Sequence, residues 1–373
     1  MAHADGPLTG VRVLDFSTMM AGPYGARYLA DLGAEVIKVE TEAGDFLRSQ
    51  APLRDGKSTY FGHLNAGKTS VVLDLKNPAD HDKAKKLVAT ADVLVENFRP
   101  GVMRRLGLDY ETLAQDNPGL IYCSISGFGQ TGEAVERPAY AQIVQASSGY
   151  DLANLGYQEQ MESPANAVFF FADVLGASYA MGAINAALYH RTVTGRGQMI
   201  DLSLMEAMMN MMPYEVQEAQ FPAERQRPIY RPVRTSDGFV MIVPNTQRNF
   251  EMLMRAIGRD DLTDHPDFAT PAKRYPKTAE IFDTVEAWSL LHSSEEAERH
   301  LVEAGVPCAR YRTVREALGD EQFAHREAFQ QVRDPAGNFL VPNLPFKMSG
   351  ARVAAGEQVP DLGESEPEDL FGR

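Results

Sequence analysis

Residues 11–40 read VRVLDFSTMMAGPYGARYLADLGAEVIKVE, and this stretch decides the fold. Its first part, VRVLDF (11–16), is a short apolar run, which is typical of a strand covered on both faces. Residues 23–32 continue with helical spacing, and Gly33 ends the helix, because glycine readily adopts the left-handed conformation that closes helices. AEVIKVE (34–40) is a second strand. The stretch therefore predicts a strand–helix–strand unit with parallel strands.

The same alternation continues as far as residue 126. TSVVLDL (69–75), DVLVENF (92–98) and LIYCSIS (120–126) are further short apolar strands, and a lysine-rich helix over residues 80–91 separates the first two. Helices that alternate with such strands predict a mostly parallel, doubly wound sheet. We therefore expect an α/β fold whose large domain is of Rossmann type.

The second half of the chain has a different character. We expect long helices over residues 140–220, a linker rich in Pro and Arg over 221–234, and a strand after the turn that begins near Thr235. Further helices are expected near 248–257, 277–292 and 294–304, with another strand over 307–311. The last fifty residues should form strands and turns that end in a mobile acidic tail.

The chain is too long for one small core, so we expect two domains. The large Rossmann-like domain should comprise residues 1–227, and residues 321–373 should return to complete it. A smaller α/β domain should occupy residues 228–320.

The composition, with 44% apolar and 23% charged residues, is that of a soluble globular protein. The net charge of −15 argues against general binding to nucleic acid or to an anionic membrane. The N-terminal MAHADGPLTG (1–10) lacks the basic and apolar regions of a secretory signal. Two cysteines, Cys123 and Cys308, are too few for a disulfide framework, and the eight histidines lack ligand spacing. We therefore expect a cytoplasmic protein without a metal site.

The turn after the first strand bears on dinucleotide binding. Residues 17–25 contain no G-x-G-x-x-G pattern, and Pro23 removes an N–H where a turn facing a pyrophosphate needs one. We therefore expect no nicotinamide cofactor.

Asp173 is the one formally charged side chain between Val168 and Tyr189, in the run VFFFADVLGASYAMGAINAALY. The run approaches membrane-spanning length, but Asp173, Ser178 and Asn185 favour a buried core helix. Burial of a carboxylate is costly, and desolvation makes it a stronger base and nucleophile. An aspartate just ahead of a helical stretch is also an ordinary N-cap. From the residues alone, Asp173 is either a helix cap or a group that takes part in chemistry.

Five segments of the chain carry a family pattern. They are LDFSTMMAGPYGARYLADLGAEVIKVE (14–40), NAGKTSVVLDLK (65–76), ADVLVENFRPGVMRRLGL (91–108), SISGFGQTG (124–132) and HRTVTGRGQMIDLSLMEAM (190–208). In this order and spacing they resemble the family III coenzyme A transferases, the relatives of formyl-CoA transferase and carnitine CoA-transferase. The resemblance extends, more thinly, to about Gly350. The family also includes α-methylacyl-CoA racemases, so the resemblance alone leaves the reaction open.

The resemblance implies that Asp173 is the catalytic nucleophile. In this family the nucleophile precedes a small-residue helix that leads into TGRGQ, which stands here at residues 194–198. The racemases carry a histidine base upstream, and Tyr140 occupies that position here, as in the transferases. The pKa of a tyrosine is poorly suited to abstracting an α-proton, which favours the transferase. A racemase and a non-catalytic acyl-CoA-binding protein on the same scaffold are the alternatives.

The resemblance also implies residues around the substrates. The acyl pocket should be lined by Tyr140 and Met20, and the nucleotide pocket by Asn97 and Phe98. The adenosine should lie near Leu73 and Lys76. The phosphates of coenzyme A should face Arg105 and Arg137. Arginine and lysine suit phosphates, and apolar or aromatic surface suits adenine.

Three departures from the formyl-transferring relatives concern the acyl group. Thr41 stands in place of a basic residue, Met19 and Met20 replace a polar pair, and residues 227–232 replace a glycine-rich loop. The acyl groups therefore stay unassigned. The expected chemistry is transfer of coenzyme A, the co-substrate, from an acyl-CoA to a small carboxylic acid through an aspartyl-CoA intermediate. The resemblance further implies an interlocked homodimer.

Overall fold

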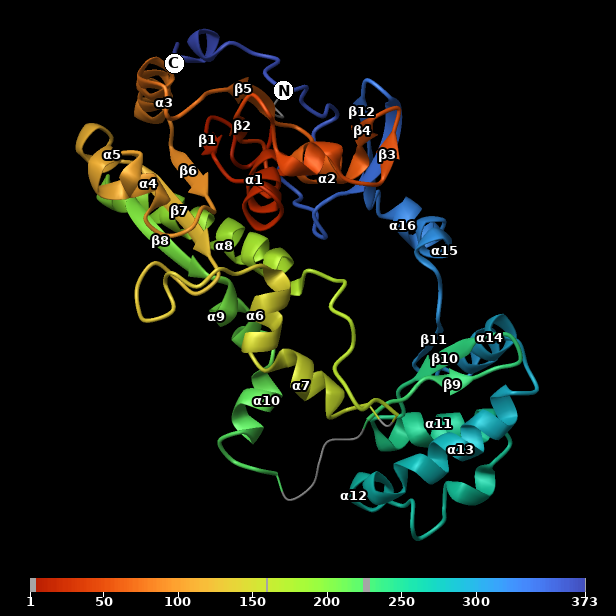
Figure 1. Cartoon of the computed structure of the whole chain (residues 1–373). Coiled ribbons are helices and arrows are strands. Elements are labelled where there is room, and N and C mark those ends of the chain that lie inside the picture. The colour runs from red at the N-terminus through yellow and green to blue at the C-terminus, as the bar shows by residue number, and fades with distance from the viewer. Residues whose placement is uncertain (1–4, 159, 224–228, 373) are drawn as a thin grey trace. The chain divides into compact units, whose positions relative to one another are not determined.

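A computed structural model describes residues 5–158, 160–223 and 229–372 (Figure 1). The chain divides into two compact units, one formed by Met1–Ala219 with Gln322–Arg373 and the other by Gln220–Glu321. The boundary expected between residues 227 and 228 lies outside the described residues and stays a prediction, as does the replaced loop where it includes them.

A parallel sheet forms the centre of the larger unit. Its strands are β1 (Arg12–Asp15), β2 (Glu35–Glu40), β5 (Thr69–Val72), β6 (Val93–Glu96), β7 (Ile121–Ser126) and β8 (Gln198–Ser203). They lie in the order β5-β2-β1-β6-β7-β8, and every adjacent pair is parallel. This is the strand order of a Rossmann sheet, in which the chain reverses its direction of winding between β1 and β6. The α/β fold with a doubly wound parallel sheet is therefore confirmed.

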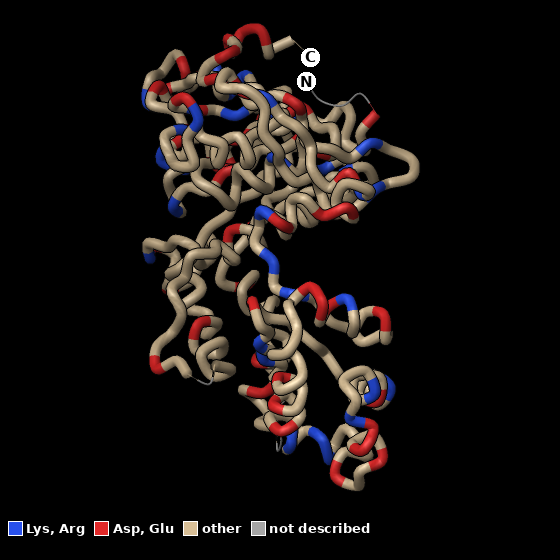
Figure 2. The backbone as a smooth tube through the Cα atoms, turned by 90° about the vertical axis from the view of Figure 1, so that its right-hand side faces the viewer, with Lys and Arg blue, Asp and Glu red and all other residues tan. Residues whose placement is uncertain are grey.

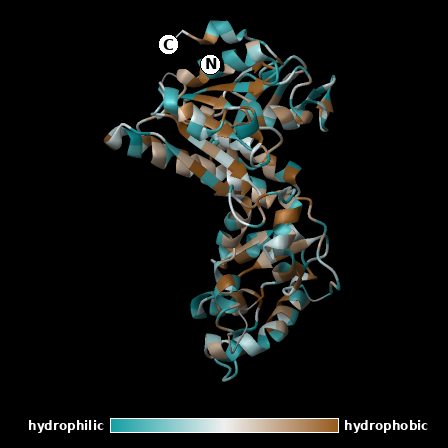
Figure 3. Cartoon of the chain, turned by 60° about the vertical axis from the view of Figure 1, so that its left-hand side comes forward, coloured by the Kyte–Doolittle hydropathy of each residue, from teal (hydrophilic) through white to brown (hydrophobic). Residues whose placement is uncertain are grey.

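Two layers of helices bury the two faces of this sheet. Alternate side chains of a strand point to opposite faces, so Val13 joins one core and Leu14 the other. The core around Val13 is formed with α1 (Ala21–Asp31), α6 (Ala141–Ser147), α8 (Phe171–Thr194) and α9 (Leu204–Asn210). The core around Leu14 is formed with α3 (Pro78–Ala89), α4 (Val102–Arg105) and α5 (Tyr110–Asp116). The strands accordingly are mostly brown, the hydrophobic colour, in Figure 3.

Helix α8 is the longest helix described and packs along α1 (Figure 1). By length and composition alone it is apolar enough to cross a membrane. Its buried residues, which include Ala172, Ala180 and Ile184, instead form part of the core around Val13. Gly25 of α1 faces Ala177 and Ala180 closely, so small residues on both helices allow their backbones to approach.

The expectation of long helices throughout residues 140–220 is wrong. Apart from α8, the helices there are short, namely α6, α7 (Tyr150–Leu155), α9 and α10 (Pro213–Glu218), and the strand β8 was not expected. Helix α8 ends at Gly195, which has a φ of 71°, and the chain then turns into pairing with β7. Apolar and polar residues alternate only briefly in Gln198–Ser203, and a methionine-rich helix follows directly. The sequence pattern therefore does not distinguish the strand from the helix.

The C-terminal segment returns to the larger unit. It contains α16 (Glu321–His325) and an antiparallel pair formed by β12 (Phe329–Asp334) and β13 (Gly337–Pro342). A second small pair, β3 (Leu53–Arg54) and β4 (Lys57–Ser58), precedes α2 (Thr59–Asn65). The acidic tail is not free, because Leu370 and Phe371 pack against the core around Leu14, and Glu368 pairs with Lys83 at 2.9 Å. These contacts contradict the expected mobile tail.

The smaller unit has its own sheet and core. Strands β9 (Val233–Arg234), β10 (Phe239–Ile242) and β11 (Cys308–Arg310) form an antiparallel sheet in the order β11-β10-β9. Its helices are α11 (Gln247–Ala256), α12 (Pro271–Arg274), α13 (Thr278–Ser289), α14 (Ser294–Glu303) and α15 (Val314–Leu318). Phe250 and Phe282 are at the centre of its core. Acidic and basic residues are interspersed along its chain (Figure 2), and ion pairs such as Arg234–Glu286, at 2.8 Å, join them.

Gly197 is required where β8 enters the sheet. A Cβ at this position would lie 2.0 Å from the Leu120 carbonyl oxygen, while the Gly197 N–H donates to the Pro118 oxygen at 2.9 Å. We expect Gly197→Ala to lower the free energy of unfolding by about 2–3 kcal/mol, because backbone atoms must move apart. Gly350→Ala is the control, since nothing lies within 4 Å of its added Cβ. Equal urea midpoints for the two variants would contradict this account of Gly197.

Candidate active site

A cavity of about 630 Å³ lies in the larger unit and involves the segments that follow β1, β6 and β7. In a doubly wound sheet, ligands bind beyond the carboxyl ends of the strands where the winding reverses, which here is between β1 and β6. The cavity is lined by Thr18, Met19, Met20, Ala21, Phe46, Leu47, Gln50, Ala51, Tyr60, Asn97, Phe98, Arg99, Ile125, Ser126, Gly127, Pro138, Ala139, Tyr140, Ala141, Gln142, Phe170, Asp173 and Leu204.

Asp173 lies in the first turn of α8 and lines this cavity. It is not the N-cap, which corrects the helix-cap interpretation. The N-cap position belongs to Phe170, and α8 has no side-chain cap. The helix begins three residues earlier than the sequence pattern indicates, because Phe171, Ala172 and Asp173 are already helical. The positive end of the helix dipole still favours a negative charge at this position.

Within the described residues, the carboxylate of Asp173 lacks a partner that would stabilise its charge. No hydrogen bond or ion pair to it occurs within the described parts of the chain, and burial raises its pKa from 3.8 to about 6. A carboxylate with a raised pKa is a stronger nucleophile than one at the surface, and at neutral pH it is still mostly ionised. The side chain is partly exposed and therefore accessible from the cavity.

Met20 and Tyr60 are neighbours of Asp173 in the cavity. The hydroxyl of Tyr60 donates to the Met20 sulfur at 3.3 Å. Burial raises the pKa of Tyr60, and the negative charge of Asp173 adds to the effect. Sequence reasoning placed Met20 in the pocket but missed Tyr60. The available signal was its place in TYFGHLN (59–65), directly before one of the five family segments.

Tyr140 is at the N-cap position of α6 and lines the same cavity. Its side chain is 67% exposed, so it is accessible to a ligand. No histidine is found among the described residues that line the cavity. The position at which the family resemblance places the base of a racemase thus lines the cavity and holds a phenol.

Asn97 and Phe98 follow β6 and also line the cavity. The Asn97 side chain is bonded within the protein, because it accepts from the Thr18 N–H at 2.9 Å and donates to the Thr18 oxygen at 2.7 Å. The Phe98 N–H donates to Glu96 at 2.8 Å. Burial raises the pKa of Glu96 to about 7.

The other four residues expected near coenzyme A do not line this cavity. The Leu73 side chain is fully buried in the core around Leu14. Lys76 and Arg105 are exposed, the first after β5 and the second in α4. Arg137 is also exposed and lies over the Phe128 ring at 4.8 Å. Their contacts with a nucleotide therefore stay predictions.

Within the described residues, possible metal ligands and thiols offer no further candidate for chemistry. Within residues 5–158, 160–223 and 229–372, no group of three or more His, Cys, Asp or Glu side chains is placed to hold a metal ion. Cys123 and Cys308 are free thiols. Burial raises the pKa of Cys308 to about 11 and that of Cys123 further, so both are protonated at neutral pH.

A family model described as CoA-transferase family III matches residues 8–366. The chain belongs to CoA-transferase family III. It is 33% identical to succinyl-CoA–D-citramalate CoA-transferase of Chloroflexus aurantiacus, with 98% of this chain and 94% of the relative covered. It is 34% identical to acetyl-CoA:oxalate CoA-transferase of Acetobacter aceti, with 94% and 91% covered.

Solved structures agree with this assignment. A CAIB/BAIF family protein from Brucella suis superposes with a TM-score of 0.84 at 32% identity, with 96% of this chain and 97% of that chain covered. Rv3272 from Mycobacterium tuberculosis superposes with a TM-score of 0.86 at 29% identity, with 96% and 98% covered. The enzyme class predicted from the five segments, a family III CoA-transferase, is thereby confirmed.

Because the pKa of Asp173 is raised, the free energy of unfolding of this CoA-transferase should depend on the ionisation of this residue. A carboxyl group whose pKa is higher in the folded than in the unfolded chain destabilises the fold when ionised, fully above about pH 6 and not at all below about pH 4. We expect Asp173→Asn to raise the free energy of unfolding at pH 8 by on the order of 1–2 kcal/mol, because the charge is partly screened. The gain should vanish at pH 4.

Urea unfolding at the two pH values measures this effect. Asp151→Asn is the matched control, since Asp151 is also in the first turn of a helix, α7, and does not line the cavity. A gain for Asp173→Asn that is independent of pH would show that burial does not raise the pKa of Asp173.

Proposed function

We propose that this family III enzyme moves coenzyme A from an acyl-CoA to a carboxylic acid with Asp173 as the covalent nucleophile. One observation carries the proposal. A half-buried carboxylate without a partner within the described residues, with a pKa raised to about 6, opens onto a cavity at the place where a doubly wound sheet binds its ligands. The names of the relatives supply the reaction class, because they transfer coenzyme A to acids such as citramalate and oxalate.

The proposed reaction has four substitutions at carbonyl carbon. The Asp173 carboxylate attacks the donor thioester, which forms a mixed anhydride and releases the CoA thiolate. The thiolate attacks the Asp173 carbonyl of the anhydride, which forms an aspartyl-CoA thioester and frees the donor acid. The acceptor carboxylate attacks this thioester, which forms a second anhydride and releases the thiolate again. The thiolate then attacks the acceptor carbonyl, which yields the new acyl-CoA and restores the Asp173 carboxylate.

Exclusion of water is essential, because hydrolysis of either anhydride or of the aspartyl thioester would waste the energy of the thioester bond. Apolar side chains on several elements surround the proposed nucleophile, among them Met20, Phe170 and Leu204. Such apolar side chains hinder water from reaching the anhydride. Polar side chains such as Gln50, Tyr60 and Gln142 also line the cavity, but within the described residues none of them is bonded to Asp173.

Coenzyme A is proposed to extend from the cavity toward exposed basic side chains. Phe98 offers an aromatic surface at the cavity wall, and Arg99 is beside it. Lys76, Arg105 and Arg137 are exposed and therefore available to phosphates, which arginine and lysine bind strongly. The identity of both acyl groups is left to experiment, and the cytoplasmic location stays a prediction.

A racemase is the alternative reaction on this scaffold. It would need a base of suitable pKa at the α-carbon of the acyl group, and the cavity offers Tyr140 rather than a histidine. An acyl-CoA-binding protein without catalysis would not need the buried carboxylate of Asp173. Both alternatives are decided by the trapping experiment below.

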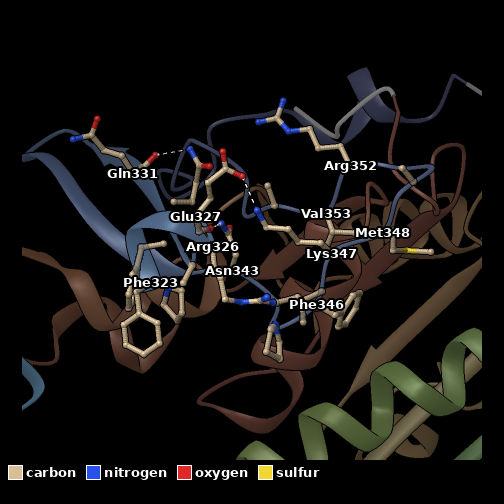
Figure 4. Close-up of a pocket in the computed structure, with 18 residues that line it drawn as sticks. Phe323, Arg326, Glu327, Gln331, Asn343, Phe346, Lys347, Met348, Arg352 and Val353 are labelled. Carbon is tan, nitrogen blue, oxygen red and sulfur yellow. Dashed lines mark hydrogen bonds and ion pairs between the residues drawn. The ribbon is translucent and has the colours of Figure 1, made fainter. Parts of the chain in front are cut away.

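We also propose that two copies associate. Helix α8 has an exposed apolar face with Val174, Tyr179, Tyr189 and Val193, of which the last two are each 73% exposed. Exposed apolar patches of this kind mark interaction surfaces. A second hollow of about 720 Å³ lies in the C-terminal segment, where Phe323 and Phe346 border the Lys347–Glu327 ion pair of 2.9 Å (Figure 4). A partner copy that covers both surfaces is consistent with the interlocked homodimer that the family resemblance implies.

The trapping experiment tests the nucleophile. The purified protein is incubated with a panel of acyl-CoA thioesters, quenched with hydroxylamine and digested. We expect a hydroxamate on Asp173, detected by peptide mass spectrometry, because hydroxylamine cleaves activated aspartyl carbonyls. Asp173→Asn should lose both the adduct and the transfer activity, by roughly a factor of a thousand or more.

Further measurements distinguish the transferase, the racemase and the non-catalytic binding protein. Adduct formation should slow by roughly tenfold per pH unit below about pH 6, as Asp173 becomes protonated. Exchange of the α-proton with deuterated solvent, in the absence of an acceptor acid and of any adduct, would instead establish the racemase. Coenzyme A binding without adduct or exchange across the panel would establish the binding protein.

The proposed association has a direct test. We expect the protein to elute as a dimer in size-exclusion chromatography with light scattering, and Ala186→Arg on the exposed face of α8 to shift it toward the monomer. A buried, unpaired arginine is costly at an interface. Gln115→Arg on the exposed surface of α5 is the control. A wild-type monomer, or a variant dimer of unchanged affinity, would refute this interface.

A further inference from the structure

The turn after β1 adopts a backbone conformation that its sequence does not favour. Met19 has a φ of 64°, in the left-handed region that residues other than glycine, asparagine and aspartate rarely occupy. Met19 and the next residue, Met20, both line the cavity that contains Asp173. Such a conformation persists only where the surrounding structure holds it, and it is most frequent at functional sites.

Asn97 holds this turn from the neighbouring strand. Its side-chain oxygen accepts from the Thr18 N–H at 2.9 Å, and its side-chain nitrogen donates to the Thr18 oxygen at 2.7 Å. The amide therefore binds both backbone groups of the residue before Met19. Because Thr18 follows β1 and Asn97 follows β6, these two bonds join the strands between which the sheet reverses its winding.

A second anchor holds the turn from the opposite side. The carbonyl of Ser17 accepts from the Lys38 ammonium at 2.9 Å, and the Ser17 hydroxyl and N–H both donate to Asp15. Lys38 is itself fixed by Asp45 at 3.1 Å, with both side chains fully buried. The backbone of Ser17 and Thr18 is thus held by hydrogen bonds on both sides. This restrains the backbone position from which Met19 and Met20 continue the chain.

The position of the turn determines what Asp173 faces. The sulfur of Met20 accepts a hydrogen bond from the Tyr60 hydroxyl at 3.3 Å. The negative charge of Asp173 contributes to the raised pKa of Tyr60. A turn that relaxed away from the left-handed conformation would move Met20 and disturb this wall. Displacement of the groups around a reacting centre by about 1 Å can lower a rate by two orders of magnitude.

We propose that Asn97 is a positioning residue, whose amide clamps Thr18 and thereby holds the Met19–Met20 turn against the Asp173 site. The inference rests on the proposed role of Asp173 as nucleophile. It differs from the role expected from the family resemblance, in which Asn97 lines the nucleotide pocket. Because both its oxygen and its nitrogen are bonded to Thr18, the side chain should affect the rate of the first step more than the affinity for coenzyme A.

Asn97→Asp tests this role, because aspartate keeps an acceptor for the Thr18 N–H but loses the donor to the Thr18 oxygen. Two quantities are measured on the full chain, the dissociation constant of coenzyme A by calorimetry and the rate of Asp173 adduct formation at saturating acyl-CoA by rapid quench. We expect the rate to fall roughly tenfold or more, with the dissociation constant unchanged within about twofold.

Asn117→Asp is the matched control. The Asn117 amide also clamps two backbone groups, at the end of α3 and just after it, donating to the Val88 and Ala91 oxygens at 3.0 Å and 2.8 Å, but it does not line the cavity. This variant should lose stability while its adduct rate per folded molecule stays that of the wild type. If Asn97→Asp does not fold, Asn97→Ser, whose shorter side chain offers a hydroxyl in place of the amide, is measured in its place.

Each outcome decides between defined alternatives. A weaker affinity for coenzyme A with an unchanged saturated rate would overturn the positioning role and restore the nucleotide-binding one. No change in either quantity, or an equal loss of rate in Asn117→Asp, would overturn it as well. Failure of the wild-type protein to form any adduct would instead refute the proposed nucleophile, on which the positioning role depends.

Discussion

The buried ion cluster beneath the turn after β1 is the constraint on which the site depends. Lys68 contacts Asp15 at 2.7 Å, and Lys38 lies between Asp15 at 3.9 Å and Asp45 at 3.1 Å, with all four side chains fully buried. Removal of one partner from such a group typically costs about 3–5 kcal/mol, because it leaves an uncompensated charge. Burial by itself would raise the pKa of Asp15, but Lys68 and Lys38 outweigh it and lower the pKa. The cluster is therefore stable only as a complete set.

Completion of this set also fixes the backbone around the site. Lys68 donates to the Pro23 oxygen at 2.7 Å and to Asn65 at 2.8 Å, so it connects α1 with the end of α2. Tyr60 is in α2, and the turn that carries Met20 leads into α1. The elements that bring these two side chains together are thus tied to the same ammonium group. A surface ion pair would not hold them, since it contributes at most about 1 kcal/mol.

The sequence predicted the framework because the framework follows from local patterns. The strands that become β1, β2, β5, β6 and β7 are short apolar runs, and each was placed to within a few residues. Residues 198–203 were not assigned as β8, because their pairing with β7 depends on the close approach of Gly197 to Leu120. The clamp between Asn97 and Thr18 was not predicted either, since its partners are far apart in sequence. A side-chain bond between two loops leaves no periodic signal in the sequence.

Asp15 and Asp173 are two carboxylates of the same unit in opposite electrostatic surroundings. Asp15 is the more deeply buried of the two, and burial alone would raise its pKa further. The pKa of Asp15 is nevertheless lowered, whereas that of Asp173 is raised to about 6. The difference lies in their partners, because Asp15 faces two ammonium groups, whereas burial alone acts on Asp173. A paired carboxylate is a weak nucleophile, since attack on a carbonyl must give up its ion pairs. The same lysines that make Asp15 a structural residue would make it unreactive, and the lack of any such partner among the described residues leaves Asp173 able to react.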